Sequence, residues 1–459
     1  MRNSAFACLI CASSLAMING QTKGDFSTPP GAPAYLPAAP VDLTHSAPQT
    51  LNNSLSGLVL KMPPGGAPSS AIFMNPNAGR QSAADTPNQN SVRRPGNVQP
   101  GGNIPGLDTV PTFNGVFSAQ GGPSSMATPL FPYTIVGNNP AQGGTTTLPA
   151  RITEVSLVLL NADGSVFTTI PFSAFEQPMV NSPQFQPSVY SSSPGQTQFA
   201  DAVQRAEFFQ TMRQDWHTLL ESQVVDRVTI TVPRFVNVQL NDGSVIQARS
   251  YYTGPTGDKN TFVIMLDLLF HYFYTNIVIN EINAGNFQPD GVNIAAFPNT
   301  FLASLNLDRP TTPGQCCVLG FHNFFYDPTA QPQPRWLTEY ASWISPGVFT
   351  NGFADITALS HETSEMFNDP FVDNVTPAWQ FPGEPSACQG NLEVGDPLEV
   401  ISNPTYPVTS SRRDAFIYHP QNVALLQWFE MGATSNAIGG AFSYPNTSIL
   451  THSATPCTP

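Results

Sequence analysis

Charged residues are scarce in this chain of 459 residues, at 10% of the sequence. A soluble domain has about a quarter, so Ser, Thr, Asn, Gln, Gly and Pro must form most of the surface. The chain has 17 Lys and Arg against 31 Asp and Glu, a formal net charge of -14, and no run of basic residues stands out. Because phosphate binding needs clustered Lys and Arg, we expect no nucleic-acid partner.

Long apolar runs and the motifs of several enzyme classes are also missing. Only residues 262–279 are apolar enough to suggest a membrane span, and Asp267 and His271 interrupt them. Titratable groups are unfavourable at the bilayer centre, so this segment predicts a buried strand and helix, with no membrane span after signal removal. The chain has no G-x-S-x-G elbow, Walker loop or dinucleotide fingerprint, which disfavours serine hydrolases and nucleotide enzymes.

The first 20 residues have the layout of a secretory signal peptide. One Arg precedes an apolar and small-residue stretch at residues 5–17, and small and polar residues follow. The alternative is an N-terminal core helix. We expect residues 1–20 to be removed and the protein to be secreted, or to lie at the cell surface or in the periplasm.

Four cysteines follow the signal segment: Cys316, Cys317, Cys388 and Cys457. An even number in an exported chain suggests two disulfides. A vicinal bridge between Cys316 and Cys317 needs a strained ring, so we expect these two residues to be joined separately to Cys388 and Cys457. Buried free thiols are the alternative.

The composition divides the chain into regions. Residues 21–126 are dense in Pro, Gly, Asn and Ser, and they have too few hydrophobic side chains to offset the entropy of ordering. They predict a disordered leader. We expect an N-terminal α+β region at 127–255 and a C-terminal, zincin-like region at 256–459, although a single elaborated domain is compatible with the length.

The elements predicted after the leader are mixed. β-branched and aliphatic residues at 151–170 surround an Asp-Gly turn, which predicts a hairpin, and the pattern recurs at 225–249. Apolar residues at helical spacing predict a helix over 198–222. Strands and helices are thus interleaved without βαβ regularity, which indicates an α+β fold.

The second half carries further apolar segments at 294–307 and 316–326. A helix is expected at 355–368. Residues 422–429, NVALLQWF, predict a last amphipathic helix.

The most informative chemical feature is residues 360–370, SHETSEMFNDP. An Asp or Thr can cap the start of this helix and Pro370 ends it. His361 and Glu365 are four residues apart, so they share a helix face and can bind one ion, as the two histidines of HExxH do in zinc proteases. Glu362 lies beside them, at the position of the general base that takes a proton from the attacking water.

Glu365 stands where the zinc-protease signature has its second histidine. A carboxylate ligand adds negative charge, which weakens the metal as a Lewis acid and shifts its preference toward harder cations. We expect a divalent metal, zinc first, with calcium or manganese as alternatives. The opposing interpretation of HExxE is a solvated helix face with ion-pair partners.

Several residues after the helix follow in a recognisable order: Asn368-Asp369-Pro370, Trp379, Cys388 and Glu393-Val-Gly-Asp396. On these residues the sequence resembles a group of secreted bacterial proteins of unassigned activity, in which a SHExxE helix runs into DP, a Trp and a Glu-x-Gly-Asp segment. The resemblance covers roughly residues 316–429, with CCVLGFHNFF and YHPQNVALLQWF at its flanks. The helix also resembles a variant of the zincin metalloprotease helix. The resemblance implies His361 and Glu365 as ligands, completed by Glu393 or Asp396.

Two functional hypotheses follow. The first is a secreted, peptidase-like metal-dependent hydrolase that acts on an extracellular peptide or polymer, with Glu362 as the catalytic residue. The second is a non-catalytic extracellular surface or matrix protein in which the same residues form a structural metal site. His322 and His419 are candidates for a third ligand or a substrate contact, although a lone His beside aromatic residues is more often a core group.

Overall fold

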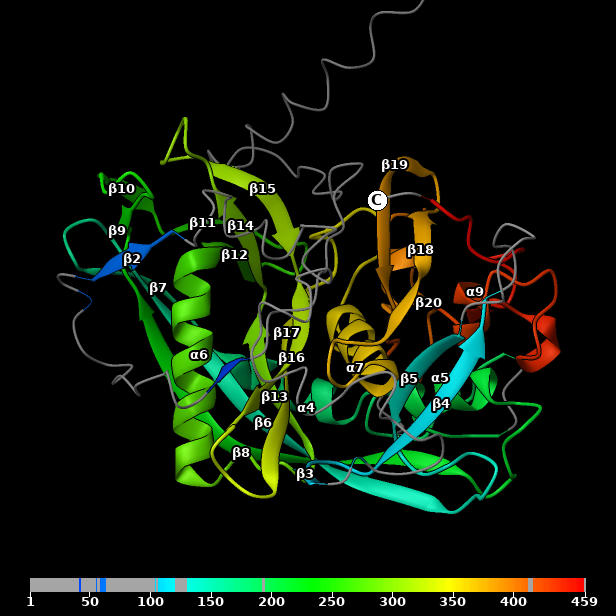
Figure 1. The fold of residues 1–459 in the computed structure, drawn as a ribbon. Coiled ribbons are helices and arrows are strands. Elements are labelled where there is room, and N and C mark those ends of the chain that lie inside the picture. Colours follow the sequence, from blue (N-terminus) through cyan, green and yellow to red (C-terminus); the bar gives the residue numbers. More distant parts are fainter. Residues whose placement is uncertain are drawn as a thin grey trace, which may run out of the picture.

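The structure, a computed structural model, describes residues 41–42, 55, 58–62, 104, 106–119, 130–191, 195–411 and 416–457. The expected signal peptide at residues 1–20 lies outside the described residues, as does most of the expected leader at 21–126. The described part is a mixture of strands and helices (Figure 1), as an α+β fold requires.

An eight-stranded mixed sheet forms the largest layer. Its main path runs β1 (Val41–Asp42), β16 (Gly320–Tyr326), β17 (Gln333–Trp343), β13 (Val292–Pro298), β6 (Thr145–Leu160) and β7 (Val166–Ile170), while β3 (Leu107–Asp108) pairs with β17 and β8 (His217–Val232) with β6. The pairs β6–β8, β6–β13 and β13–β17 are parallel, and β16–β17 and β6–β7 are antiparallel. Every residue of β13 is buried, as expected for a central strand covered on both faces. The sheet takes strands from both sides of the expected boundary at residue 255.

Smaller sheets surround this layer. They are β11 (Tyr251–Pro255), β12 (Thr261–Leu266), β14 (Thr300–Leu305) and β15 (Pro313–Val318); β10 (Val245–Arg249), β9 (Phe235–Gln239) and β2 (Val59–Lys61); and the pairs β4 (Thr112–Ser118) with β5 (Leu130–Val136), β18 (Val375–Phe381) with β19 (Glu384–Asn391) and β20 (Val423–Ala424) with β21 (Ser443–Tyr444). Strands β1 to β4 come from the expected leader, so the described parts of residues 21–126 contain regular structure. Buried side chains in and beside β4, such as Val110 and Asn114, explain why this segment is ordered.

The helices are α4 (Glu176–Val180), α5 (Phe199–Glu207), α6 (Asp267–Ala284), α7 (Thr357–Asn368), α8 (Asp396–Glu399) and α9 (Leu426–Phe429), with 3-10 turns at Phe172–Ala174 and Ile438–Gly440. The long helix α6 packs against β12, β13 and β14. Helix α7 lies between β16 and β17 on one side and α5 and β5 on the other (Figure 1). All 12 residues of α7 are consequently buried.

Several predicted elements are confirmed. The β6–β7 and β9–β10 hairpins contain the Asp-Gly turns at Asp163 and Asp242, where Gly164 and Gly243 have positive φ angles. Residues 262–279 form all but the first residue of strand β12 and most of helix α6, as expected. Among the described residues, no helix is long and apolar enough to cross a membrane.

Two predicted helices are largely wrong. The segment 198–222 is helical only over Phe199–Glu207, because its end belongs to β8, which pairs with β6 along Thr145 to Leu159. The segment 422–429 has helical structure only in the single turn Leu426–Phe429, because its first residues form β20 with β21. In both places, strand pairing with a distant segment overrides the local apolar spacing.

The disulfide pairing also differs from the prediction. Cys316 is bonded to Cys317, and Cys388 is bonded to Cys457 with a Cα–Cα distance of 6.1 Å. Topology explains the second pair, because the amide of Cys457 donates to the carbonyl of Ala378 in β18, beside β19, which carries Cys388. The vicinal cysteines belong instead to β15 in the four-stranded sheet.

Candidate metal centre

Helix α7 positions the residues of the HExxE motif. The residue before the helix is Ile356, which has no capping side chain, but the Thr357 hydroxyl accepts a hydrogen bond of 3.0 Å from the amide of Ala354. The helix ends at Asn368, and Pro370 follows two residues later, as predicted. The Asp369 carboxylate accepts backbone hydrogen bonds from the next turn. Both helix ends are therefore tied to neighbouring backbone.

His361 directs one imidazole nitrogen toward two carboxylates. Its Nε2 lies 3.1 Å from Glu365 Oε1 and 3.8 Å from Asp396 Oδ1. Its Nδ1 lies 3.1 Å from the amide oxygen of Gln421, whose Nε2 donates to the carbonyl of Gly395 at 2.8 Å. Because that amide oxygen can only accept, Nδ1 carries a proton and Nε2 faces the carboxylates. Such an outer hydrogen bond fixes the tautomer of metal-binding histidines.

Gly395, in the Glu-x-Gly-Asp segment, lies directly against His361. Its amide donates to Glu365 Oε1 at 3.0 Å. A Cβ at this position would lie 2.4 Å from His361 Nδ1, closer than nonbonded atoms approach. Glycine is thus required here for the loop at 393–396 to reach the helix.

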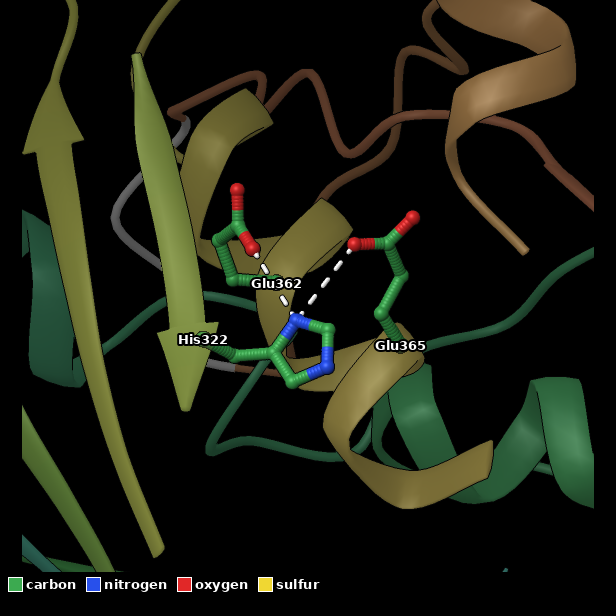
Figure 2. Close-up of side chains that lie close together, drawn as sticks. All are labelled: His322, Glu362 and Glu365. Atoms are coloured by element: carbon green, nitrogen blue, oxygen red, sulfur yellow. Dashed lines mark hydrogen bonds and ion pairs between the residues drawn. The ribbon is translucent and has the colours of Figure 1, made fainter. Parts of the chain in front are cut away.

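His322 approaches the same helix from β16. Its Nδ1 lies 3.4 Å from Glu362 Oε2 and 3.5 Å from Glu365 Oε2, and Figure 2 shows the imidazole between the two carboxylates. Gly320, also on β16, makes room for Glu362, because a Cβ there would lie 2.7 Å from Glu362 Cγ. The main sheet therefore contributes both a candidate ligand, His322, and the space that Glu362 occupies.

We call the following residues the α7 cluster: His322, His361, Glu362, Glu365, Glu393 and Asp396. Each is at most 1% exposed. Asp396 Oδ2 accepts a hydrogen bond of 2.5 Å from Gln389, whereas its Oδ1 has no hydrogen-bond partner among the described residues. Neither carboxyl oxygen of Glu393 has a hydrogen-bond partner among the described residues. Buried polar atoms normally have hydrogen-bond partners, so these oxygens are candidate ligands.

The cluster holds more carboxylates than its histidines can neutralise. Burial raises the pKa of Glu393 well above its ordinary value, and the charge of Glu365 raises it further. The same two causes, in the same order, raise the pKa of Asp396. Burial lowers the pKa of His361, but the charges of Glu365 and Glu362 outweigh burial and raise this pKa to about 9. Such a site attracts a cation.

The geometry brings together most of the residues that the sequence singled out. His361, Glu365 and Asp396 place one ligand atom each within 4.8 Å of one another, and His322, Glu362 and Glu365 do the same. This buried group of His, Glu and Asp side chains could hold a metal ion. The interpretation of HExxE as a solvated helix face is wrong, because all of α7 is buried.

Other candidates have different positions. Glu393 belongs to neither group of three, although its carboxyl interacts electrostatically with Glu365 and His322. His419 lies apart, with its Nδ1 2.7 Å from Asp355 Oδ2. The sequence left His322 as one of two candidates, and its only signal was an imidazole inside the apolar run LGFHNFF.

No protein-family model, curated protein or solved structure matches this chain.

Proposed function

We propose that this is an exported protein that binds a divalent metal ion in the α7 cluster, with His361, Glu365 and Asp396 as ligands. The observation that carries the proposal is the gathering of these three ligand atoms within 4.8 Å in a buried site. The signal-peptide layout of residues 1–20 supports export.

The donor atoms suit a divalent ion. Imidazole nitrogen and carboxylate oxygen are ordinary zinc ligands, and carboxylates also suit calcium and manganese. A buried carboxylate is unfavourable unless a cation or hydrogen-bond donors compensate it, and Asp396 Oδ1 has no hydrogen-bond donor among the described residues. The hydrogen bond that His361 Nδ1 donates to the Gln421 amide oxygen leaves Nε2 directed at the carboxylates of Glu365 and Asp396. We expect zinc, with manganese and calcium as alternatives.

The test is elemental analysis of the full chain, exported from its host and purified without added metal. We expect at least one equivalent of a divalent metal, and His361→Gln should bind less metal than the wild type. The matched control is His419→Gln, because His419 also faces a carboxylate but lies outside the α7 cluster. Metal-free protein that takes up no zinc, manganese or calcium on titration would refute the proposal.

Metal-dependent hydrolysis of a peptide or other extracellular polymer is a second candidate function, and the environment of Glu362 favours it. Burial raises the pKa of Glu362 to about 6, against the opposing hydrogen bond with His322. Its Oε1 has no hydrogen-bond partner in the described part of the chain. A carboxylate of this kind can accept a proton near neutral pH. A divalent ion, when bound, would supply an activated water and polarise a substrate carbonyl.

Burial of the α7 cluster bears on whether its metal site is catalytic or structural. The ligands are at most 1% exposed, so a polymer can reach them only if the surrounding loops move. If the protein is a hydrolase, Glu362→Gln abolishes cleavage of an unstructured protein such as casein while the metal at His361 is retained. If wild-type protein loaded with zinc or manganese leaves casein, peptides and polysaccharides intact, the metal has a structural role.

A further inference from the structure

The ligand atoms of the α7 cluster separate into two groups rather than one. His361 belongs to the first group with Asp396, and His322 belongs to the second with Glu362. Glu365 is the single member that the two groups share. Each group thus has an imidazole and a carboxylate of its own.

Glu365 presents a different oxygen to each group. Its Oε1 lies 3.1 Å from His361 Nε2, whereas its Oε2 lies 3.5 Å from His322 Nδ1. The amide of Gly395 donates to Oε1 and holds the carboxylate in this orientation. A carboxylate that bridges two metal ions uses one oxygen for each, and the ions of two-metal sites are about 3.5–4 Å apart.

We infer that the α7 cluster binds two divalent metal ions bridged by the Glu365 carboxylate. The first ion is bound by His361 and Asp396, and the second by His322 and Glu362. This inference rests on the proposed function, because it assigns a second ion to the same metal site.

Two observations support the second ion. Glu362 Oε1 and both oxygens of Glu393 have no hydrogen-bond partners among the described residues, although both side chains are 1% exposed. The cluster also has four buried carboxyl groups, those of Glu362, Glu365, Glu393 and Asp396, against two imidazoles, so it has enough carboxyl ligands for two ions. Uncompensated charge is strongly unfavourable in a buried site.

The second ion changes the role of Glu362. In a site with one metal ion, Glu362 is free to accept a proton, and Glu362→Gln leaves the metal content unchanged. In the bridged pair Glu362 is a ligand, so the same substitution removes one ion. Metal content therefore distinguishes the two roles without any measurement of activity.

The experiment loads chelator-treated full-length protein with Mn(II) and combines metal analysis with electron paramagnetic resonance. We expect two Mn(II) per wild-type chain and the spectrum of a magnetically coupled pair. His322→Gln and Glu362→Gln should each leave one Mn(II) with the spectrum of an isolated ion. His419→Gln, the control, should keep the coupled pair.

Each result decides between the proposals. One Mn(II) per wild-type chain overturns the two-ion inference and leaves metal binding intact, whereas no bound Mn(II), Zn(II) or Ca(II) overturns both. Two uncoupled ions in the wild type, or a count that His322→Gln and Glu362→Gln leave at two, also overturn the inference. The wild-type spectrum is decisive even if a variant does not fold.

Discussion

Asp201 and Glu393 are both buried carboxylates, but their surroundings are opposite. Asp201, on α5, accepts hydrogen bonds from the Thr197 hydroxyl at 2.6 Å and the Thr218 amide at 2.6 Å, and its Oδ2 lies 2.8 Å from His217 Nδ1. Neither oxygen of Glu393 has a hydrogen-bond partner among the described residues. Burial alone therefore does not distinguish a structural carboxylate from a candidate ligand, whereas the supply of donors does.

The two regions also differ in how charge is compensated. At Asp201 one carboxylate meets one imidazole, and the side chain of His217 is 29% exposed, so water reaches the pair. In the α7 cluster, four carboxylates meet two imidazoles that are at most 1% exposed. The Asp201 site is complete without an added ion, and the α7 cluster is the place where a cation should change stability.

Metal removal should produce the largest effect. A chelator should lower the Tm of the wild-type protein, and zinc or manganese should restore it, because metal that binds only the folded state stabilises it. Metal at 1,000 times its Kd should raise the free energy of unfolding by about 4 kcal/mol. Scanning calorimetry with and without chelator measures this change.

The control for that experiment is His361→Gln, whose Tm should respond less to the chelator than that of the wild type. An equal response of the variant and the wild type would mean that the chelator acts elsewhere, and the contrast with Asp201 would be lost.

Asp201→Ala and Asp396→Ala should separate the two kinds of carboxylate. The first substitution leaves the buried Thr218 amide and Thr197 hydroxyl without their acceptor, so it should destabilise the protein by roughly 3 kcal/mol. This loss should be the same with and without metal. Asp396→Ala should destabilise metal-loaded protein more than metal-free protein, because it removes a ligand. Denaturant unfolding of both variants in zinc and in chelator measures the difference.

If the stability loss in Asp201→Ala depended on metal, the two carboxylates would not differ in kind. The same would follow if the stability loss in Asp396→Ala were equal with and without metal.

The helix of the site was predictable because its signals are local. His361 and Glu365 are four residues apart, and Pro370 ends the helix, so their common face follows from helix geometry. The carboxylates near residue 393 followed from the resemblance. These parts needed no knowledge of how distant segments pack.

The rest of the site depends on contacts between distant segments. His322 lies 40 residues before Glu362, and only the pairing of β16 with β17 brings it to α7. The same limit explains the helix predicted over 198–222, because the pairing of β8 with β6 is not visible in local spacing. The prediction that Cys316 and Cys317 pair separately with Cys388 and Cys457 was wrong for the same reason, because the choice of partners depends on which sheet holds each cysteine.

Gly395→Ala should weaken metal binding without a new charge. The added Cβ would lie 2.4 Å from His361 Nδ1, so the imidazole must move away from Glu365 and Asp396. Steric displacement of one ligand should lower the affinity for zinc by about 10- to 100-fold, the range seen when residues supporting a metal ligand are changed. Isothermal titration of chelator-treated protein measures the affinity.

Gly390→Ala is the matched control, because a Cβ at Gly390 would make only ordinary contacts at 3.6 Å or more. Equal affinities of the two glycine variants would show that His361 does not need its observed position.

The smallest expected effect concerns the ion pair of His419 and Asp355, which lies outside both the Asp201 site and the α7 cluster. The hydrogen bond with Asp355 raises the pKa of His419 above its ordinary value of 6.5, against the opposing effect of partial burial. A histidine whose pKa is raised by folding stabilises the protein fully below its unfolded pKa, and this contribution is lost as pH rises through the folded pKa. His419→Gln should therefore lower the free energy of unfolding more at pH 5.5 than at pH 9. Urea unfolding of both proteins at the two pH values, with metal held constant, measures the difference. A larger loss at pH 9 would show that the variant disturbs packing at the start of α7 rather than an ion pair, and the pair would then belong with the hydrogen-bonded structural carboxylates.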